Sequence, residues 1–331
     1  DNFEQRQLRL SVTLKQDHDD LDALKRRAEE LRAADPTRAP KPFFLGDDVV
    51  IADSGLSPDG RFLLVVTTPK GFDAGRSGKM PKYVTESGYE EVEDTRTRVG
   101  RNDPAPQTLW LLDLVKHESA RLAYTDLPGI KDDPLAAIRA ENEKAKAERD
   151  EAGKVSADKK SGEKDAKKNE PKERPLQVAA VQFARNGAAA VMLRANDNKD
   201  RWIASIDTDK RRLRLQHRLT DPAWINWNFC EFGLADDGRT LWYVSEETGY
   251  AQLYAKPLDG KARALTQGRF EVSSPEPTPD GAWFYVRANT ADAPYAYDIY
   301  RLRSGGGALE RITQLQSVTG FALSPDGSRV L

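Results

Sequence analysis

The chain of 331 residues has few of the residues that most often form disulfides, hold metals or carry catalytic protons. It contains one cysteine, Cys230, and three histidines, His18, His117 and His217. An intrachain disulfide needs two cysteines, and no two of the histidines have the spacing of zinc ligands. We therefore expect no disulfide, no metal site and no cofactor. Cys230 lies in an apolar run and is predicted to be a small core residue.

Long apolar runs and an excess of positive charge are also missing. The composition is 38% hydrophobic and 31% charged, and the formal net charge is -2. No stretch approaches the ~18 apolar residues of a membrane-spanning helix, and no signal peptide is visible. Without a basic excess to neutralise phosphates, nucleic acid is not an expected partner.

The motifs of common catalytic sites are absent as well. The chain has no Gly-x-Ser-x-Gly nucleophile elbow, no P-loop and no dinucleotide-binding fingerprint. The three histidines stand in charged or turn-like surroundings, so each is expected to be a surface residue rather than a general base. The sequence therefore predicts no catalytic residue in this chain.

What the sequence does contain is a recurring phrase. A hydrophobic residue, one or two small residues, Asp or Asn, Gly and a polar residue precede an apolar run. The copies are LSPDGRFLLVV from Leu56, FARNGAAAVML from Phe183, LADDGRTLWYV from Leu234, PTPDGAWFYV from Pro277 and ALSPDGSRVL from Ala322. Asp-Gly supplies the positive φ of a tight hairpin turn, and the apolar run is typical of a strand. Each copy therefore predicts a β-hairpin.

A second phrase follows the first in most copies and predicts two further strands. It reads TLWLLDL, RWIASID, AQLYAKPLDG and DIYRLRSGGG, and a short fourth run follows a polar turn. Gly238, Gly281 and Gly327 are spaced within the ~40–50 residues of propeller blades. A single four-stranded blade cannot bury both its faces, so blades stack around an axis. We predict an all-β fold: a partial β-propeller of four-stranded antiparallel blades.

The predicted propeller covers residues 47–331 and has about four blades and the start of another. The last hairpin stops at Leu331 within a strand, which would leave an unpaired hydrophobic edge. We therefore expect a fragment of a seven- or eight-bladed propeller. Residues 1–46 are predicted to be a helical insertion and linker, with a helix from Glu4 to about Ala34 that packs on the rest of the protein.

Two insertions interrupt the blades. Residues 69–107 separate the second and third strands of the first blade, and long loops on a rigid scaffold are often functional. Residues 131–174 are charged; residues 135–152 fit a solvated helix, and residues 154–174 have too few large apolar side chains to order. We predict a flexible insertion there.

Two places are candidates for binding a ligand. The adjacent carboxylates of Glu90 and Glu91 could hold an ammonium group through charge-assisted hydrogen bonds. The alternative is a solvated acidic loop, balanced by the neighbouring arginines Arg96, Arg98 and Arg101.

The second place is WINWNF, from Trp224 to Phe229, where tryptophan and asparagine side chains could line a pocket. The alternative is that both tryptophans pack between blades. The nearby SEETGYAQLY, from Ser245 to Tyr254, is interpreted as structural, with Gly249 making the turn.

Residues 47–130 and 176–331 resemble the propeller of dipeptidyl peptidase IV-like serine peptidases, within the prolyl oligopeptidase family. That propeller carries Ser-Glu-x-x-Gly-Tyr/Trp-x-x-Leu-Tyr, followed by Leu-Thr-x-Gly-x-x-x-Val. The matching residues are Ser245, Glu246, Gly249, Tyr250, Leu253, Tyr254, Leu265, Thr266, Gly268 and Val272. The stretch RVGRNDPAPQTLWLLDL is also similar to a family loop that leads into a strand.

The resemblance implies an eight-bladed propeller followed by an α/β-hydrolase domain with a Ser–Asp–His triad, which this chain does not contain. Such propellers screen peptides by size and bind the free N-terminus through acidic residues, so that dipeptides are released. The family's loop after the tryptophan lines the substrate cavity, which implies that Trp227 and Asn228 bind substrate.

The sequence departs from the family at the paired glutamates, which precede the strand of the SPDG hairpin. Asp47 and Asp48 stand there instead, and Glu-Glu pairs occur at 90–91 and 29–30. Dipeptidyl release is therefore left open.

We expect this chain to be the non-catalytic propeller segment of a serine exopeptidase, gating peptide access. Its expected partners are peptide substrates and the protein's own hydrolase domain and N-terminal blades, and a homodimer is left open. By analogy with similar bacterial enzymes, a periplasmic or secreted location is expected. The alternative is a stand-alone propeller that binds or scaffolds other proteins.

Overall fold

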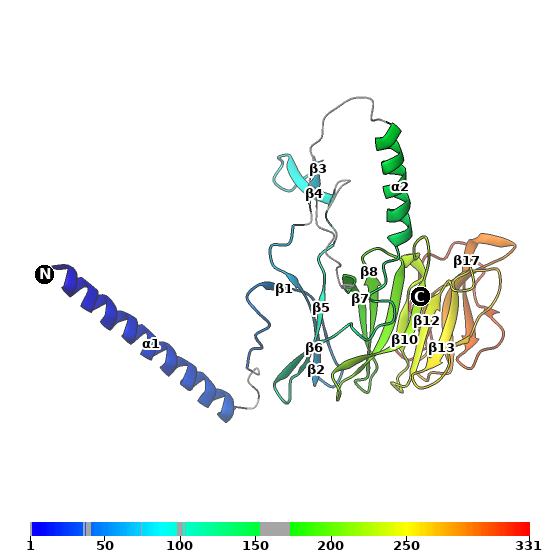
Figure 1. Ribbon diagram of the computed structural model, residues 1–331. Coiled ribbons are helices and arrows are strands. Elements are labelled where there is room, and N and C mark those ends of the chain that lie inside the picture. The colour runs from blue at the N-terminus through cyan, green and yellow to red at the C-terminus, as the bar shows by residue number, and fades with distance from the viewer. Residues whose placement is uncertain are drawn as a thin grey trace.

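The computed structural model describes residues 2–35, 37, 41–73, 75–97, 102, 104–152 and 173–331. Its described strands form four four-stranded antiparallel sheets and one two-stranded hairpin. The four large sheets stand side by side in chain order and do not close into a ring (Figure 1). The predicted fold class, a partial β-propeller with an N-terminal helix, is confirmed.

Each sheet is one blade, and its strands follow one another in sequence across the sheet. Blade 1 contains β1 (Val49–Leu56), β2 (Phe62–Pro69), β5 (Thr108–Asp113) and β6 (Glu118–Leu122). Blade 2 contains β7 (Leu176–Phe183), β8 (Ala189–Ala195), β9 (Asp200–Asp207) and β10 (Arg212–Thr220). Blade 3 contains β11 (Phe232–Leu234), β12 (Thr240–Ser245), β13 (Gln252–Pro257) and β14 (Arg263–Ala264). Blade 4 contains β15 (Val272–Pro277), β16 (Trp283–Thr290), β17 (Ala293–Arg303) and β18 (Glu310–Arg311).

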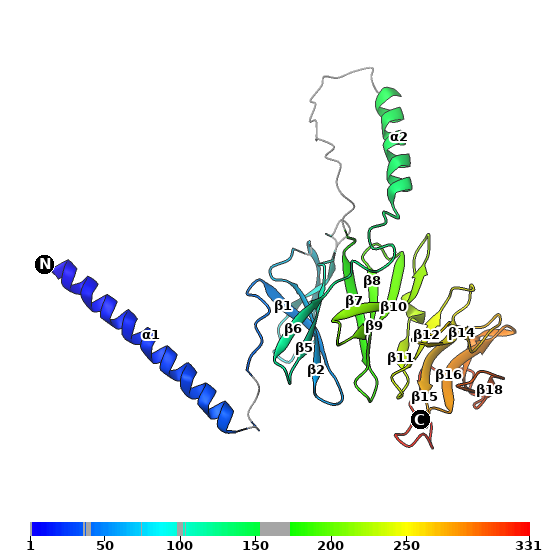
Figure 2. The same ribbon diagram turned by 60° about the horizontal axis from the view of Figure 1, so that its bottom comes forward.

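Antiparallel order sends the loops of every blade alternately to two ends of the molecule. The Asp-Gly turns and the turns between third and fourth strands lie at one end, which we call the hairpin end. The turns between second and third strands and the links between blades lie at the other, which we call the connector end. The extra hairpin of β3 (Ser77–Lys82) and β4 (Glu91–Thr97) and helix α2 (Ala136–Ala152) both rise from the connector end (Figure 1), and Figure 2 shows α2 there in a second view.

The cores of the protein lie between neighbouring blades. One apolar cluster joins blades 1 and 2 and includes Leu64 and Trp202. A second joins blades 2 and 3 and includes Met192 and Tyr243, with the half-buried Cys230 packed against it. A third fills the interface between blades 3 and 4. Because both faces of blade 2 are covered, its strand β8 is almost continuously apolar and buried.

The predicted Asp-Gly turns are present at the hairpin end, and turns of neighbouring blades contact one another. Gly187 and Gly238 have φ of 84° and 63°, which favour glycine. The Asn186 amide donates to the carbonyl of Asp237 at 3.0 Å. A Cβ on Gly238 would lie 2.3 Å from Asn186 Oδ1. The glycine is therefore required both by its own turn and by the neighbouring blade.

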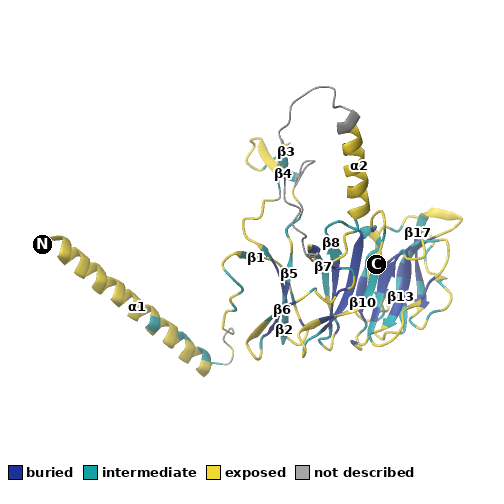
Figure 3. Cartoon of the chain, in the orientation of Figure 1, coloured by how far each residue is buried: buried dark blue, intermediate teal, exposed yellow. Residues whose placement is uncertain are grey.

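Helix α1 (Asn2–Ala34) forms where it was predicted and ends before Pro36. No residue of it is buried, and it points away from the blades (Figure 3). The predicted packing is thus not found within the described chain. Apolar residues spaced three and four apart indicate which face of a helix could be buried. They do not indicate which other surface would cover that face, or whether this chain supplies it.

Helix α2 confirms the helix predicted at 135–152, and residues 153–172 lie outside the described residues. Arg174, the last residue of the segment expected to be flexible, is buried. Its guanidinium bonds Asp197 at 2.7 Å and Asp200 at 2.6 Å, so the insertion rejoins blade 2 at a firm ion-pair network.

Candidate contacts at the connector end

The link between blades 2 and 3 carries the WINWNF phrase and is clamped to the β8–β9 turn. The amide of Asp221 donates to the carbonyl of Lys199 at 2.9 Å, and the amide of Ile225 donates to the carbonyl of Asn198 at 3.0 Å. The ammonium of Lys199 donates to the carbonyls of Pro222 and Ala223. These bonds hold the backbone on both sides of Trp224, at the start of the phrase.

The two tryptophans of this phrase have different surroundings. Trp227 is half-buried against the core of blades 2 and 3, and its Nε1 donates to Asn198 Oδ1. The guanidinium of Arg194 lies 4.8 Å from the centre of its ring. Trp224 remains 72% exposed. Packing between blades, the alternative weighed for both tryptophans, describes Trp227 and does not describe Trp224.

Asn228 is exposed on the one-turn helix η1 (Trp227–Phe229). Its backbone amide donates to Asn226 Oδ1 at 3.2 Å, and no hydrogen bond of its own side chain is found among the described residues. The side chain of Asn228 is therefore free to meet a ligand at the connector end.

A carboxylate that the sequence interpretation missed lies beside this loop. Asn226 Nδ2 donates to Glu246 Oε1 at 3.4 Å. Burial raises the pKa of Glu246, and the nearby carboxylates of Glu271 and Asp221 raise it further, against the lowering effects of Asn226 and Arg201. The SEETGY phrase does turn at Gly249, whose φ is 91°. The same turn also carries Glu246. The adjacent glutamates Glu246 and Glu247, just before Gly249, are the sequence feature that could have indicated a binding carboxylate here.

The second glutamate of that phrase pairs with a histidine on the next blade. His217 Nε2 lies 2.9 Å from Glu247 Oε2, and the imidazole packs on Tyr243 with 4.3 Å between ring centres. Burial lowers the pKa of His217, and the hydrogen bond from His217 lowers the pKa of Glu247. The side chain of His217 is only 10% exposed. The expectation of a surface histidine was wrong here, because β10 faces blade 3.

His18 and His117 are exposed, as expected. His117 stacks on Phe43 with 4.3 Å between ring centres. Among the described residues, no group of three or more His, Cys, Asp or Glu side chains is placed to hold a metal ion.

Glu90 and Glu91 are both exposed on the β3–β4 hairpin. Glu91 Oε1 accepts from Ser87 Oγ at 2.8 Å, and Glu91 is paired with Lys82 in the register of the hairpin. The topology places these glutamates at the same end as Trp227 and Asn228. No hydrogen bond or ion pair between the two groups is found in the described chain. The balancing guanidinium groups of Arg96, Arg98 and Arg101 lie outside the described residues.

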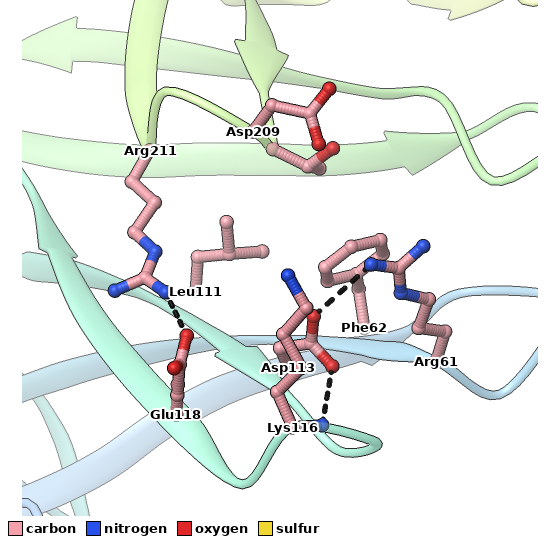
Figure 4. Close-up of a pocket in the computed structure, with 9 residues that line it drawn as sticks. Arg61, Phe62, Leu111, Asp113, Lys116, Glu118, Asp209 and Arg211 are labelled. Carbon is pink, nitrogen blue, oxygen red and sulfur yellow. Dashed lines mark hydrogen bonds and ion pairs between the residues drawn. The ribbon is translucent and has the colours of Figure 1, made fainter.

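Two cavities open at the hairpin end, away from these residues. The smaller, of about 60 Å³, lies between blades 1 and 2. Figure 4 shows that Arg61 pairs with Asp113 within blade 1, and that Arg211 of blade 2 pairs with Glu118 of blade 1. This space is sufficient only for a few water molecules. The larger, of about 700 Å³, lies between blades 3 and 4 and is lined in part by Trp242 and Phe284.

Comparison with known proteins identifies the family. The model of the dipeptidyl peptidase IV N-terminal region matches residues 155–331. The chain belongs to this family. The matched part of this dipeptidyl peptidase IV N-terminal region contains Trp227, Asn228 and Glu246, whereas Glu90 and Glu91 precede it.

Solved structures of dipeptidyl peptidases share the fold. Porphyromonas gingivalis dipeptidyl peptidase 4 superposes with a TM-score of 0.57 and 15% identity, over 84% of this chain and 32% of that one. A putative dipeptidyl aminopeptidase IV from Bacteroides ovatus superposes with a TM-score of 0.52 and 10% identity, over 87% and 38%.

Two curated proteins are similar in sequence over shorter stretches. An uncharacterized peptidase of Bacillus subtilis is 30% identical over 128 residues, which are 35% of this chain and 18% of that protein. An uncharacterized protein of Agrobacterium fabrum is 27% identical over 120 residues, 36% of this chain and 38% of that protein. The chain thus spans less than two fifths of each of these proteins. No helix in the described part of the chain is long and apolar enough to cross a membrane.

Proposed function

We propose that this chain is the non-catalytic propeller segment of a dipeptidyl peptidase IV-like serine exopeptidase. In this proposal the blades gate the access of peptides to an α/β-hydrolase domain outside the chain, and the connector end helps to bind the substrate N-terminus. The protein acts in the periplasm or outside the cell. Its partners are peptides and that hydrolase domain, and a homodimer is compatible with the proposal.

The observation that carries the proposal is the position of Glu246 within the family-matched blades. Burial raises the pKa of its half-buried carboxylate, and repulsion from the carboxylates of Glu271 and Asp221 raises it further. A ligand ammonium would relieve the repulsion and form a charge-assisted hydrogen bond. The free side chain of Asn228 stands in the same loop as Asn226, the residue that holds Glu246.

Glu90 and Glu91 remain the second candidates for the same task. They are exposed and stand on an insertion that rises from the connector end. Exposed carboxylates hold an ammonium more weakly than half-buried ones, because water screens the attraction. We therefore rank Glu246 above them.

The alternative function, a stand-alone propeller that binds other proteins, is favoured by one observation. The cavity of about 700 Å³ opens at the hairpin end, between blades 3 and 4. That volume lies within the range of ligand pockets. A binding module would use this end, whereas the peptidase proposal uses the connector end.

The test compares dipeptide anilides with free and acetylated N-termini, using the full-length product of the gene. Hydrolysis that strongly prefers the free N-terminus supports the proposal, and absence of hydrolysis in the full-length protein contradicts it. Glu246→Gln should lower kcat/KM for the free peptides by about tenfold or more, since an ion pair at the site is lost.

Two variants complete the test. Glu90→Gln with Glu91→Gln shows whether the hairpin shares the task. The matched control is Glu310→Gln, which removes an exposed carboxylate at the hairpin end, paired with Arg301 at 2.9 Å. If Glu310→Gln and Glu246→Gln lower kcat/KM equally, the loss comes from the change in net charge and not from a contact between Glu246 and the substrate.

A further inference from the structure

The loop between blades 2 and 3 carries two tryptophans, of which Trp227 is half-buried and Trp224 is exposed. Trp227 is held between blades by Asn198 and Arg194. Trp224, three residues earlier, is 72% exposed at the connector end. Single exposed apolar side chains are common and need no explanation on their own. What distinguishes Trp224 is the rigidity of the backbone that presents it.

The carboxylate of Asp221 folds the loop back under Trp224. Its Oδ1 accepts from the amide of Ala223 at 2.7 Å and from the amide of Trp224 at 2.9 Å. This is the side-chain-to-backbone bonding of an Asx turn.

The β8–β9 turn of blade 2 also holds the backbone on both sides of Trp224. Lys199, only 8% exposed, donates to the carbonyls of Pro222 and Ala223 just before the tryptophan. Ile225, just after it, is buried and bonds Asn198 through its backbone. An aromatic side chain on a backbone fixed in this way loses little conformational entropy when it binds.

The position of Trp224 relates it to the proposed substrate contact. Two residues later in the same clamped loop, Asn226 donates to Glu246. A peptide whose N-terminal ammonium lies at Glu246 would therefore have its first side chains beside the loop that carries Trp224. Tryptophan combines a large apolar area with few rotatable bonds, and it is enriched among residues that dominate binding.

We propose that Trp224 is a specificity-determining contact that packs on an apolar side chain of the bound peptide. The inference rests on the proposed function and extends it to a substrate class: peptides with a bulky apolar side chain at or next to the free N-terminus. Trp227 then stabilises the loop, and Trp224 selects the ligand.

The experiment uses the full-length protein and X-Ala-p-nitroanilides in which X is Phe, Leu or Gly. The measured quantity is the ratio of kcat/KM for Phe to that for Gly. Trp224→Ala should lower this ratio by about tenfold, the effect of losing one aromatic packing contact. Trp224→Phe keeps a flat ring and should retain most of the preference.

The matched control is Tyr295→Ala. Tyr295 is 94% exposed on β17, next to the β16–β17 turn at the same end of the neighbouring blade 4. This control should leave the ratio unchanged. Thermal unfolding should show that both alanine variants remain folded, because each removes an exposed side chain.

Failure of the inference and failure of the proposed function are distinguishable. If the wild-type protein hydrolyses none of these peptides, the proposed function fails. The same ratio is then measured as relative binding, from the fluorescence anisotropy of Phe-Ala and Gly-Ala peptides labelled at their C-termini. An unchanged ratio in Trp224→Ala, by hydrolysis or by binding, overturns the inference. An equal fall in Tyr295→Ala also overturns it, as does a wild-type preference for Lys over Phe when Lys-Ala-p-nitroanilide is added to the series.

Discussion

His217 on blade 2 and Glu247 on blade 3 join their two blades through a hydrogen bond of 2.9 Å between Nε2 and Oε2. The imidazole Nδ1 lies 3.5 Å from Nη2 of Arg201, whose side chain is fully buried. A guanidinium can only donate, so Nδ1 accepts and Nε2–H donates to Glu247. This arrangement requires a neutral imidazole, and the hydrogen bond from His217 lowers the pKa of Glu247 and so favours its ionised form.

The blade 2–blade 3 interface should therefore weaken as the pH falls. Because burial lowers the pKa of His217, the unfolded chain binds protons first, and stability is lost as the pH falls through the ordinary histidine value of 6.5. The lowered pKa of Glu247 adds a second loss below its ordinary value of 4.5. Amide exchange of β10 and β12, corrected for intrinsic pH dependence, should show increasing opening from pH 7.5 to pH 5.5, values chosen to bracket the histidine range.

Replacing the histidine tests the cause of that change. His217→Gln keeps a donor toward Glu247 and cannot be protonated, so the pH dependence of exchange should flatten. His18→Gln, at an exposed histidine on α1, is the control and should leave the profile intact. A wild-type profile that is flat across this range would show that His217 does not titrate on opening.

Asp200 should be the carboxylate on which the return of the charged insertion depends most. It is 1% exposed and accepts from Arg174, Arg218 and Thr220. These bonds lower its pKa although burial opposes them. Asp200→Asn leaves two guanidinium groups without their shared charge, and should destabilise the protein by about 3–5 kcal/mol.

The control for Asp200 is an exposed ion pair in the next blade interface. Asp259 pairs with Arg214 at 2.6 Å, and its side chain is 85% exposed. Asp259→Asn should have little effect, because exposed pairs are screened by water. Similar melting temperatures for the two variants would mean that the Asp200 network is not a main support of blade 2.

The interlocking of the Asp-Gly turns can be tested with two glycines of similar φ. Gly238→Ala would place a Cβ 2.3 Å from Asn186 Oδ1, whereas nothing lies within 4 Å of the corresponding position at Gly60. Both variants carry the cost of positive φ, about 1–2 kcal/mol. Thermal unfolding should show a larger loss for Gly238→Ala, since that turn also contacts the neighbouring blade. Equal losses would contradict the contact between turns.

Lys199 should act as a positioning residue for Trp224. Lys199→Ala removes the donor to the carbonyls of Pro222 and Ala223 and leaves the indole itself in place. The Phe-to-Gly preference should fall by a smaller factor than in Trp224→Ala. In this variant the loop that carries Trp224 should become more mobile, which faster amide exchange of residues 223–226 would show. Unchanged exchange there would contradict the clamp.

The repeat of Asp-Gly hairpins and apolar runs was sufficient to predict the blades, because both signals are local. A positive φ at Gly238 and an alternating or buried strand after it depend only on neighbouring residues in the chain. The predicted helices at α1 and α2 formed for the same reason. Predictions that needed a partner surface did less well: α1 does not pack on the described blades, and His217 is not a surface residue.

The candidate site shows the same division. The sequence by itself determined that a tryptophan- and asparagine-rich link joins two blades and that a glutamate pair precedes Gly249. Only the tertiary structure decided that Trp227 packs inward while Trp224 stays exposed, and that Glu246 meets Asn226. Those outcomes depend on Asn198, Lys199 and Arg194, which belong to another turn and strand. Such contacts arise when blades stack, and local residue patterns do not encode which side chains then meet.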